Sequence, residues 1–316
     1  MKIVVCVKSK AIVANLSELL PEDEIVAVSL VESKDGIDDA DVLVPSMAEI
    51  TKETIEKAKA LRLIQQYGAS LDGVDIQAAT KKGIYVANVP SEHTGNGESV
   101  AELAIFLMLA LARNFARAKE NIQKRKTGSP IGTTLKGKTA GIIGVGGIGK
   151  NLIRRLKALE INIMAISKHP SEEKKKTLGI DFYGGTEALP RVLKVADFVV
   201  LCTPLTEETR GIIGKEELKM MKDTAFLINV GRGPLIDYVA LLWALENKEI
   251  AGVGLDVFWQ EPPDPADPIF RYNTVATPHI GGATDISLRK IGEAVAENIN
   301  RIRRGEKPLH CVNIPG

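Results

Sequence analysis

The sequence predicts an α/β protein with two doubly wound parallel sheets. Three observations lead to this fold class. Short apolar runs rich in β-branched residues alternate with helical patterns along the chain. A Gly-x-Gly-x-x-Gly sequence separates one of these runs from a helix near the middle, and a second series of strands and helices begins there. The length of 316 residues is also enough for about two domains.

A series of short strands is predicted in the first third of the chain. They are expected at residues 2–7, 24–28, 41–45, 62–67 and 83–89. Helical patterns occupy residues 51–60 and 75–83 between them. Strands separated by helices pair in parallel, because the crossover returns the chain to the same end of the sheet. Residues 94–126 then predict one long helix, apolar nearly all round in its first half and basic and amphipathic in its second.

A second series of strands follows a segment rich in Gly, Ser and Thr at 127–139. Six strands are expected, at residues 140–145, 161–167, 197–202, 225–230, 252–257 and 273–278. Six is the number in a complete dinucleotide-binding sheet. A last helix is expected over 283–305. We expect the long helix to lead into the second domain and the last helix to lead out of it, which gives a substrate domain of residues 1–95 and 284–316 around a dinucleotide-binding domain of residues 96–283.

Composition argues against several classes of function. The 41 basic and 40 acidic residues give a net charge of +1, so nucleic acid is not an expected partner. Cys6, Cys202 and Cys311 are scattered, which fits a reducing cytoplasm better than a disulfide framework, and no Cys/His spacing indicates a metal site. The longest apolar run, 103–112, is about half a membrane span, so a buried helix is expected instead of a membrane partner.

The segment "GIIGVGGIGKNL" at 141–152 predicts a cofactor loop, because it directly follows a strand and opens a helix. Gly144 allows a tight turn, Gly146 lets the backbone approach a pyrophosphate, and Gly149 lets the helix pack on the strand. The first turn of the helix, with Ile148, offers backbone N–H groups to the anion. The pattern predicts dinucleotide binding, and ordinary turn glycines are the alternative.

The end of the following strand lacks the carboxylate that usually binds the adenosine ribose about 20 residues after the glycines. Ser167, Lys168 and His169 stand there instead. A carboxylate accepts hydrogen bonds from both ribose hydroxyls and repels a 2′-phosphate, whereas a hydroxyl and one or two cationic donors do the reverse. These residues therefore favour NADP over NAD, unless Lys168 and His169 are simply solvated loop residues before Pro170.

Four further patterns accompany the glycine loop. They are "GNGESVAELAIFLMLALAR" (95–113), "TPLTEETRGIIG" (203–214), "INVGRGPLID" (228–237) and "GLDVFWQEPPDPADPIF" (254–270) with "TVATPHIGGAT" (274–284). In this order they resemble the linking helix, adenine-side loop, catalytic-arginine segment and acid-histidine segments of the D-isomer-specific 2-hydroxyacid dehydrogenases. The resemblance implies an NAD(P)-dependent oxidoreductase whose Rossmann cofactor domain is inserted in a discontinuous flavodoxin-like substrate domain. It also implies a homodimer.

The same resemblance implies Arg232, Glu261 and His279 as the catalytic residues. The chemistry of 2-oxo acid reduction agrees with these residue types. The planar guanidinium of an arginine binds a carboxylate through two hydrogen bonds. A histidine exchanges protons near neutral pH, and a carboxylate beside it orients the ring and favours its protonated form. Each residue alone has a plain alternative, namely a surface arginine, a loop charge or a packed histidine, but all three follow predicted strands, where doubly wound sheets bind ligands.

The resemblance further implies that Asp256 holds the nicotinamide carboxamide. It implies a cofactor-lining set at the strand ends, formed by Cys202, Thr203, Pro204, Val230, Gly231, Gly281 and Gly282. Cys202 taken alone fits a buried strand-end thiol. In the first domain, "QYGASLDGVDIQAA" (66–79) is similar to the family's substrate-carboxylate loop, with N–H donors at Ala69 and Ser70. Ser70 stands where the family often has glycine.

A small 2-oxo acid such as glyoxylate or hydroxypyruvate, reduced with NADPH, is the expected substrate. Related phosphoglycerate dehydrogenases have a basic pair in the loop that here reads "VPSMAEI" (44–50), and they continue beyond the point where this sequence ends. Related formate dehydrogenases have Gln where this chain has Glu261. Phosphoglycerate dehydrogenase stays an alternative, as does a dinucleotide-sensing corepressor on the same scaffold. The apolar helix over 99–112 is consistent with a dimer seam.

Overall fold

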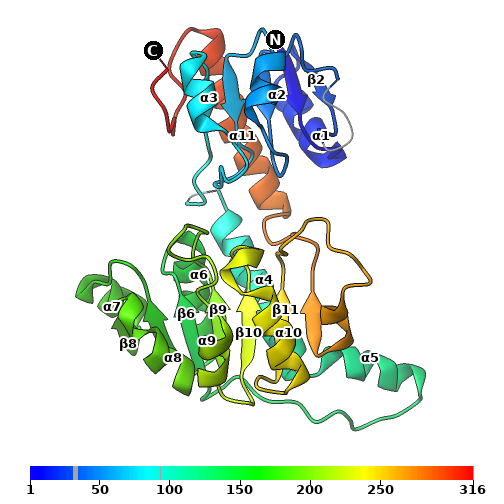
Figure 1. Ribbon diagram of the computed structural model, residues 1–316, viewed down its shortest axis with the longest axis vertical. Coiled ribbons are helices and arrows are strands. Elements are labelled where there is room, and N and C mark those ends of the chain that lie inside the picture. The colour runs from blue at the N-terminus through cyan, green and yellow to red at the C-terminus, as the bar shows by residue number, and fades with distance from the viewer. Residues whose placement is uncertain (31–34, 93, 316) are drawn as a thin grey trace. The chain divides into compact units, whose positions relative to one another are not determined.

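The computed structural model describes residues 1–30, 35–92 and 94–315. The chain divides into two compact units, one of residues 1–96 with 283–316 and one of residues 97–282. Each unit contains its own parallel sheet, and helices connect most of its successive strands (Figure 1). The predicted fold class, α/β with two doubly wound parallel sheets, is confirmed.

The first unit has a five-stranded sheet in the order β2-β1-β3-β4-β5, and all neighbours are parallel. This is the strand order of flavodoxin-like sheets. Its strands are β1 (Lys2–Val5), β2 (Glu24–Ala27), β3 (Val42–Val44), β4 (Leu63–Gln65) and β5 (Tyr85–Ala87). Alternate residues of β1 enter different cores: Ile3 and Val5 pack with α1 (Lys10–Leu19) and α11 (Asp285–Arg303). Val4 packs on the other face, with α2 (Lys52–Lys57) and α3 (Ile76–Lys81).

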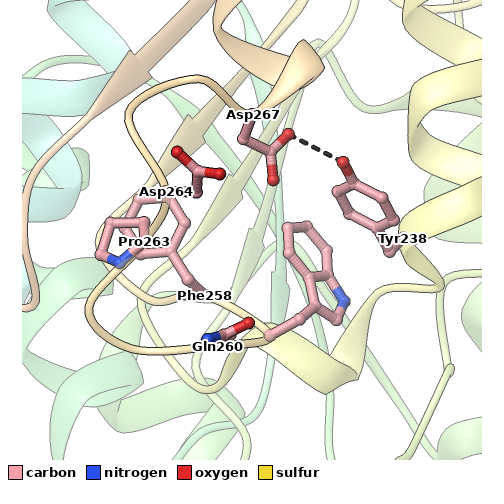
Figure 2. Close-up of a pocket in the computed structure, with 7 residues that line it drawn as sticks. Tyr238, Phe258, Gln260, Pro263, Asp264 and Asp267 are labelled. Atoms are coloured by element: carbon pink, nitrogen blue, oxygen red, sulfur yellow. Dashed lines mark hydrogen bonds between the residues drawn. The ribbon is translucent and has the colours of Figure 1, made fainter.

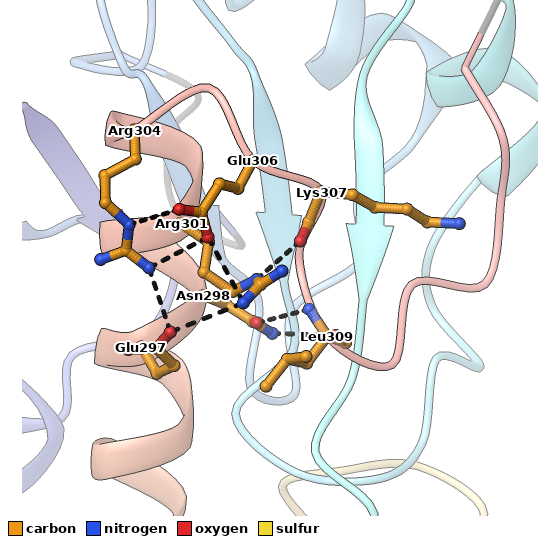
Figure 3. A network of polar contacts seen from close by, with 7 residues as sticks. All are labelled: Glu297, Asn298, Arg301, Arg304, Glu306, Lys307 and Leu309. Atoms are coloured by element: carbon orange, nitrogen blue, oxygen red, sulfur yellow. Dashed lines mark hydrogen bonds and ion pairs between the residues drawn. The ribbon is translucent and has the colours of Figure 1, made fainter.

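Polar contacts fix the segment after α11 within the first unit (Figure 3). The buried Asn298 of α11 donates to the carbonyl of Leu309 at 3.0 Å and accepts from its N–H at 2.7 Å. Arg301 donates to the carbonyl of Lys307 at 2.7 Å. Cys311 then pairs with Ala87 of β5 in an antiparallel bridge. These contacts explain how residues beyond the last helix extend the edge of the sheet.

The second unit has a seven-stranded sheet in the order β12-β11-β10-β9-β6-β7-β8, again with all neighbours parallel. Six of these strands have the order of a dinucleotide-binding sheet, and β12 extends it. The strands are β6 (Thr139–Ile143), β7 (Asn162–Ile166), β8 (Phe182–Gly184), β9 (Phe198–Leu201), β10 (Phe226–Asn229), β11 (Gly252–Leu255) and β12 (Thr274–Ala276). The sequence prediction missed β8, because its three residues are half-buried at an edge and carry no apolar run.

Helices cover both faces of this second sheet. Ile142, Ala165 and Val200, which lie side by side on β6, β7 and β9, pack against α4 (Asn96–Ala112), α6 (Gly147–Ala158) and α7 (Glu172–Leu178). The opposite face carries α8 (Leu189–Val195), α9 (Lys215–Met220) and α10 (Tyr238–Glu246). Short 3-10 turns span Thr186–Ala188, Gly233–Leu235 and Pro268–Arg271. Because all the strands are parallel, the loops that follow them lie together at the carboxyl end of the sheet.

The predicted long helix over 94–126 is two helices, α4 and α5 (Phe115–Gln123), which are bent by 58° relative to each other. The break falls at Asn114, whose φ of 48° is left-handed, a conformation that asparagine tolerates better than most residues. The buried apolar face of α4 ends at Ala112, so core packing does not hold the following residues in line with α4. In the part of the chain that the structure describes, no single helix is long and apolar enough to cross a membrane, and α4 and α5 meet that test only as this bent pair.

Candidate active site

The glycine loop joins β6 to α6, and its three glycines have different surroundings. Gly144 has a φ of +100°, and a Cβ there would lie 2.9 Å from the backbone of Cys202. A Cβ on Gly149 would overlap the carbonyl oxygen of Gly144. A Cβ on Gly146 would meet nothing within 4 Å, and among the described residues no side chain caps α6. The open space at Gly146, beside the N–H groups of the first turn of α6 with the half-buried Ile148, fits a pyrophosphate.

The loops after β9 and β10 border this turn. Cys202 is buried, and burial raises the pKa of its thiol to about 12, so the thiol stays protonated. A Cβ on Gly231 would lie 2.8 Å from the carbonyl oxygen of Thr203, which places the two loops in contact. Val230 is buried beside them, and the carbonyl of Pro204 accepts a hydrogen bond from Thr209 at 2.8 Å. The residues implied to line the cofactor thus gather at the carboxyl end of the sheet.

The end of β7 carries two polar contacts. The Ser167 hydroxyl lies 2.7 Å from the Tyr183 hydroxyl. The Lys168 ammonium donates to both carboxylate oxygens of Glu208, at 2.8 and 3.1 Å. His169 is exposed. The sequence prediction missed both partners: Tyr183 lies on the missed strand β8, and Glu208 lies 40 residues from Lys168 in the loop after β9.

Glu261 and His279 meet beside the ends of β11 and β12. Glu261 Oε2 lies 2.6 Å from His279 Nδ1, and Oε1 accepts the Phe258 N–H at 3.0 Å. Burial raises the pKa of Glu261, but the hydrogen bond and charge of His279, the Phe258 N–H and the charge of Arg232 outweigh it, so the net shift is downward. The contact occupies Nδ1 and leaves Nε2 as the imidazole nitrogen able to exchange a proton with a ligand.

Asp256 organises the turn that carries His279. Its carboxylate is buried and accepts hydrogen bonds from the Thr277 hydroxyl at 2.7 Å and from the N–H groups of Ile280 and Gly281 at 2.8 and 2.9 Å. Its carbonyl oxygen accepts the His279 N–H at 2.8 Å. His279 has a left-handed φ of 53°, which costs free energy in a residue with a Cβ. We conclude that the hydrogen bonds of Asp256 hold this turn in place. The turn ends at Gly282, which is half-buried.

Arg232 follows β10 and lies in the same region. Asn229 fixes its backbone, accepting the Gly231 N–H at 3.0 Å and donating to the Arg232 carbonyl at 2.7 Å. A Cβ on Gly233 would overlap the carbonyl group of Phe258, so the arginine segment packs directly on the loop that carries Glu261. The structure therefore brings the three predicted catalytic residues into one region of the second unit.

A cavity of about 240 Å³ lies beside the Glu261 loop (Figure 2). Tyr238 donates to Asp267 at 2.7 Å, and its ring meets Trp259 edge-on with a centroid distance of 5.0 Å. The Trp259 indole donates to the carbonyl of Ile236 at 2.7 Å. These contacts attach the loop to the segment that follows Arg232. The sequence prediction did not include them, because only the folded chain places residues 236–238 against residues 259–267.

The predicted substrate loop belongs to the first unit. The carbonyl of Ala69 accepts a hydrogen bond from Asn88 at 2.6 Å, and the carbonyl of Ser70 accepts one from Gln66. The Ser70 hydroxyl accepts the Asp72 N–H at 3.3 Å. These bonds fix the carbonyls, and within the described ranges the N–H groups of Ala69 and Ser70 make no hydrogen bond. Their implied part in binding a substrate stays a prediction.

Comparisons with known proteins agree with the motifs and the fold. The family model described as "D-isomer specific 2-hydroxyacid dehydrogenase, NAD binding domain" matches residues 105–281. A glyoxylate reductase of Pyrococcus furiosus is 39% identical over 302 residues, which cover 92% of this chain and 87% of that protein. A D-3-phosphoglycerate dehydrogenase of Methanocaldococcus jannaschii is 39% identical over 287 residues, which cover 90% of this chain but only 54%, about half, of that protein.

Among solved structures, a D-lactate dehydrogenase from Aquifex aeolicus complexed with NAD and lactic acid is 25% identical. It superposes with a TM-score of 0.83 over 97% of this chain and 96% of its own. The family match spans more than half of the sequence, and the relatives match it nearly throughout. The chain therefore belongs to the D-isomer-specific 2-hydroxyacid dehydrogenase family and is an oxidoreductase with that family's NAD-binding domain.

Proposed function

We propose that this chain interconverts small 2-oxo acids and D-2-hydroxy acids, with Arg232, Glu261 and His279 as its catalytic residues. The observation that carries the proposal is the 2.6 Å contact between Glu261 and His279, beside Arg232, at the carboxyl ends of parallel strands. The names of the relatives support the substrate class, since they include a glyoxylate reductase and a D-lactate dehydrogenase.

A reduced nicotinamide, when bound, would supply a hydride, so the chain must bind the acid and deliver one proton. The guanidinium of Arg232 binds the carboxylate of the 2-oxo acid and orients its ketone. His279 donates a proton from Nε2 to the ketone oxygen, and it accepts that proton in the reverse direction. Glu261 holds the ring through Nδ1. Because its pKa is lowered, Glu261 stays ionised at neutral pH and stabilises the protonated imidazole.

NADP is the proposed preferred coenzyme. Two hydroxyls, of Ser167 and Tyr183, and the ammonium of Lys168 gather at the end of β7, and no carboxylate is part of the strand end itself. Such groups suit a 2′-phosphate better than a ribose hydroxyl. Asp256 is the proposed partner of the nicotinamide carboxamide, in addition to its contacts within the turn.

The test is a matched fluorescence titration of the protein with NADH and NADPH, followed by turnover assays. We expect tighter binding of NADPH and oxidation of the coenzyme with glyoxylate or hydroxypyruvate. Turnover restricted to 3-phosphohydroxypyruvate would instead identify a phosphoglycerate dehydrogenase. Coenzyme binding without turnover of any 2-oxo acid would favour a dinucleotide-sensing protein.

A homodimer is proposed on the apolar surface of α4, α5 and the segment after them. This surface is formed by Phe106, Leu109, Phe115, Ile122 and Ile131, whose exposed fractions lie between 41% and 90%. Large apolar side chains exposed on neighbouring elements are typical of an interface. Sedimentation equilibrium checks the proposal: the unaltered chain should be dimeric, and Phe106→Glu combined with Phe115→Glu should shift it toward the monomer.

A further inference from the structure

An ion pair joins the loop after β7 to the loop after β9. Lys168 lies at the end of β7, and Glu208 approaches it from the other loop with both carboxylate oxygens. Both side chains are largely exposed, at 65% and 70%, so a ligand can reach them. The end of β7 is also where dinucleotide-binding sheets distinguish a ribose hydroxyl from a 2′-phosphate. The pair therefore lies where coenzyme choice is made.

Local hydrogen bonds hold both partners in place. Ser167, directly before Lys168, bonds through its N–H to the Gly184 carbonyl at 3.2 Å and through its hydroxyl to Tyr183. On the other side, the Thr209 hydroxyl accepts the Thr206 N–H at 2.7 Å and donates to Pro204, which closes a turn around Glu208. The backbone on both sides is thus held where the two exposed side chains can meet.

We propose that Glu208 is a specificity-determining residue that limits the preference of this site for NADP by pairing with Lys168. The proposal rests on the proposed coenzyme site. Lys168 is a cation that a 2′-phosphate could contact at the strand end, and Glu208 is already paired with it. A 2′-phosphate carries up to two negative charges, so it must compete with the carboxylate of Glu208 for Lys168. The 2′-hydroxyl of NAD has no charge and can bind while the ion pair stays intact.

Glu208 in this way reduces the positive charge that Lys168 offers to a 2′-phosphate at the end of β7. The expected result is a protein that accepts both coenzymes, with Lys168 favouring NADP and Glu208 opposing it. The hydrogen bond and charge of Lys168 also lower the pKa of Glu208, so the carboxylate is ionised wherever the enzyme works near neutral pH.

The experiment measures dissociation constants for NADH and NADPH by fluorescence at low ionic strength, where exposed charges are least screened. Glu208→Gln removes the charge and keeps the shape. It should tighten NADPH binding by about threefold and leave NADH binding within about twofold, the range expected for exposed ion pairs. Glu207→Gln is the matched control, because Glu207 is the adjacent acid and makes no ion pair within the described ranges. It should leave the ratio of the two constants unchanged.

A double-mutant comparison isolates the action through Lys168. Lys168→Gln should weaken NADPH binding, and adding Glu208→Gln to it should then restore little. The inference would be overturned if Glu208→Gln left the ratio of the NADH and NADPH dissociation constants unchanged, or if Glu207→Gln changed that ratio equally. The proposed function would still stand in that case, provided that the unaltered protein binds coenzyme. Failure of the unaltered protein to bind either coenzyme would overturn the proposed function and the inference with it.

Discussion

Glu261 Oε2 lies 2.6 Å from His279 Nδ1, and the second oxygen of Glu261 accepts the N–H of Phe258. Both oxygens of this carboxylate thus have a fixed partner, and the ring of His279 has a fixed orientation. Burial opposes ionisation of Glu261, yet its neighbours lower its pKa overall. The carboxylate is therefore a permanent negative charge beside the imidazole, and its effect on proton transfer can be measured.

Glu261→Gln tests that effect. Glutamine keeps the size and one acceptor oxygen but removes the charge that stabilises the imidazolium. We expect kcat for 2-oxo acid reduction to fall by about 10- to 100-fold, because the carboxylate orients the ring and favours its protonated form. Glu207→Gln is the control for loss of a negative charge elsewhere. An unchanged kcat in Glu261→Gln would contradict the role of this carboxylate.

The same variant should change the pH dependence of stability. The pKa of Glu261 is lowered in the folded chain, so its ionised form stabilises the fold at neutral pH, and this contribution is lost as the pH falls through the lowered pKa. Chemical unfolding of the unaltered protein should therefore show a loss of unfolding free energy on acidification that is smaller in Glu261→Gln. Equal acid dependence in both proteins would contradict the expectation.

Arg232→Lys tests bidentate recognition of the carboxylate. Lysine keeps the positive charge but cannot make two parallel hydrogen bonds. We expect kcat/KM for the 2-oxo acid to fall by at least about 30-fold, since weakening a close charge pair commonly costs 2 kcal/mol or more. The dissociation constants of NADH and NADPH should stay within about twofold of wild type. Coenzyme binding that weakens as much as turnover would show that Arg232 supports the fold of the loop rather than the substrate.

Much of this architecture could be predicted from the sequence, because alternating apolar runs and glycine spacing are local signals. Two elements could not. The strand β8 is three half-buried residues without an apolar run, and the bend at Asn114 interrupts a segment whose residues are all compatible with a helix. The contacts of Ser167 with Tyr183 and of Lys168 with Glu208 could not be predicted either. They depend on strand order, which places β7 beside β8 and lets the β9 loop approach from the other side.

The glycines at 146 and 149 allow a test that separates fold from coenzyme binding. A Cβ at Gly149 overlaps the carbonyl oxygen of Gly144, so Gly149→Ala should force β6 and α6 apart and lower the unfolding free energy by about 1–3 kcal/mol. A Cβ at Gly146 meets only open space, so Gly146→Ala should keep the melting temperature. Titration should nevertheless show weaker coenzyme binding, by about tenfold, because the methyl group occupies the space of the pyrophosphate. Unchanged coenzyme binding in Gly146→Ala would contradict the placement of the pyrophosphate.

Asp256→Asn tests whether the buried carboxylate holds the turn of His279. Burial raises the pKa of Asp256, and the hydrogen bonds from Thr277, Ile280 and Gly281 only partly offset this, so the folded chain takes up a proton at higher pH than an ordinary aspartate does. Protonation converts one acceptor oxygen into a donor that faces an N–H group, which should release the strained backbone of His279. Activity should therefore decline as the pH falls, at pH values above the usual pKa range of an aspartate.

Asparagine imitates the protonated form at every pH. Asp256→Asn should therefore have a low kcat at every pH and show no such acid-side decline, at a cost of about 1–3 kcal/mol in unfolding free energy. Thr277→Val removes one donor but keeps the charge, and it should lower kcat by a smaller factor while the acid-side decline stays. A variant Asp256→Asn that retained wild-type kcat at neutral pH would show that the turn holds His279 without this carboxylate.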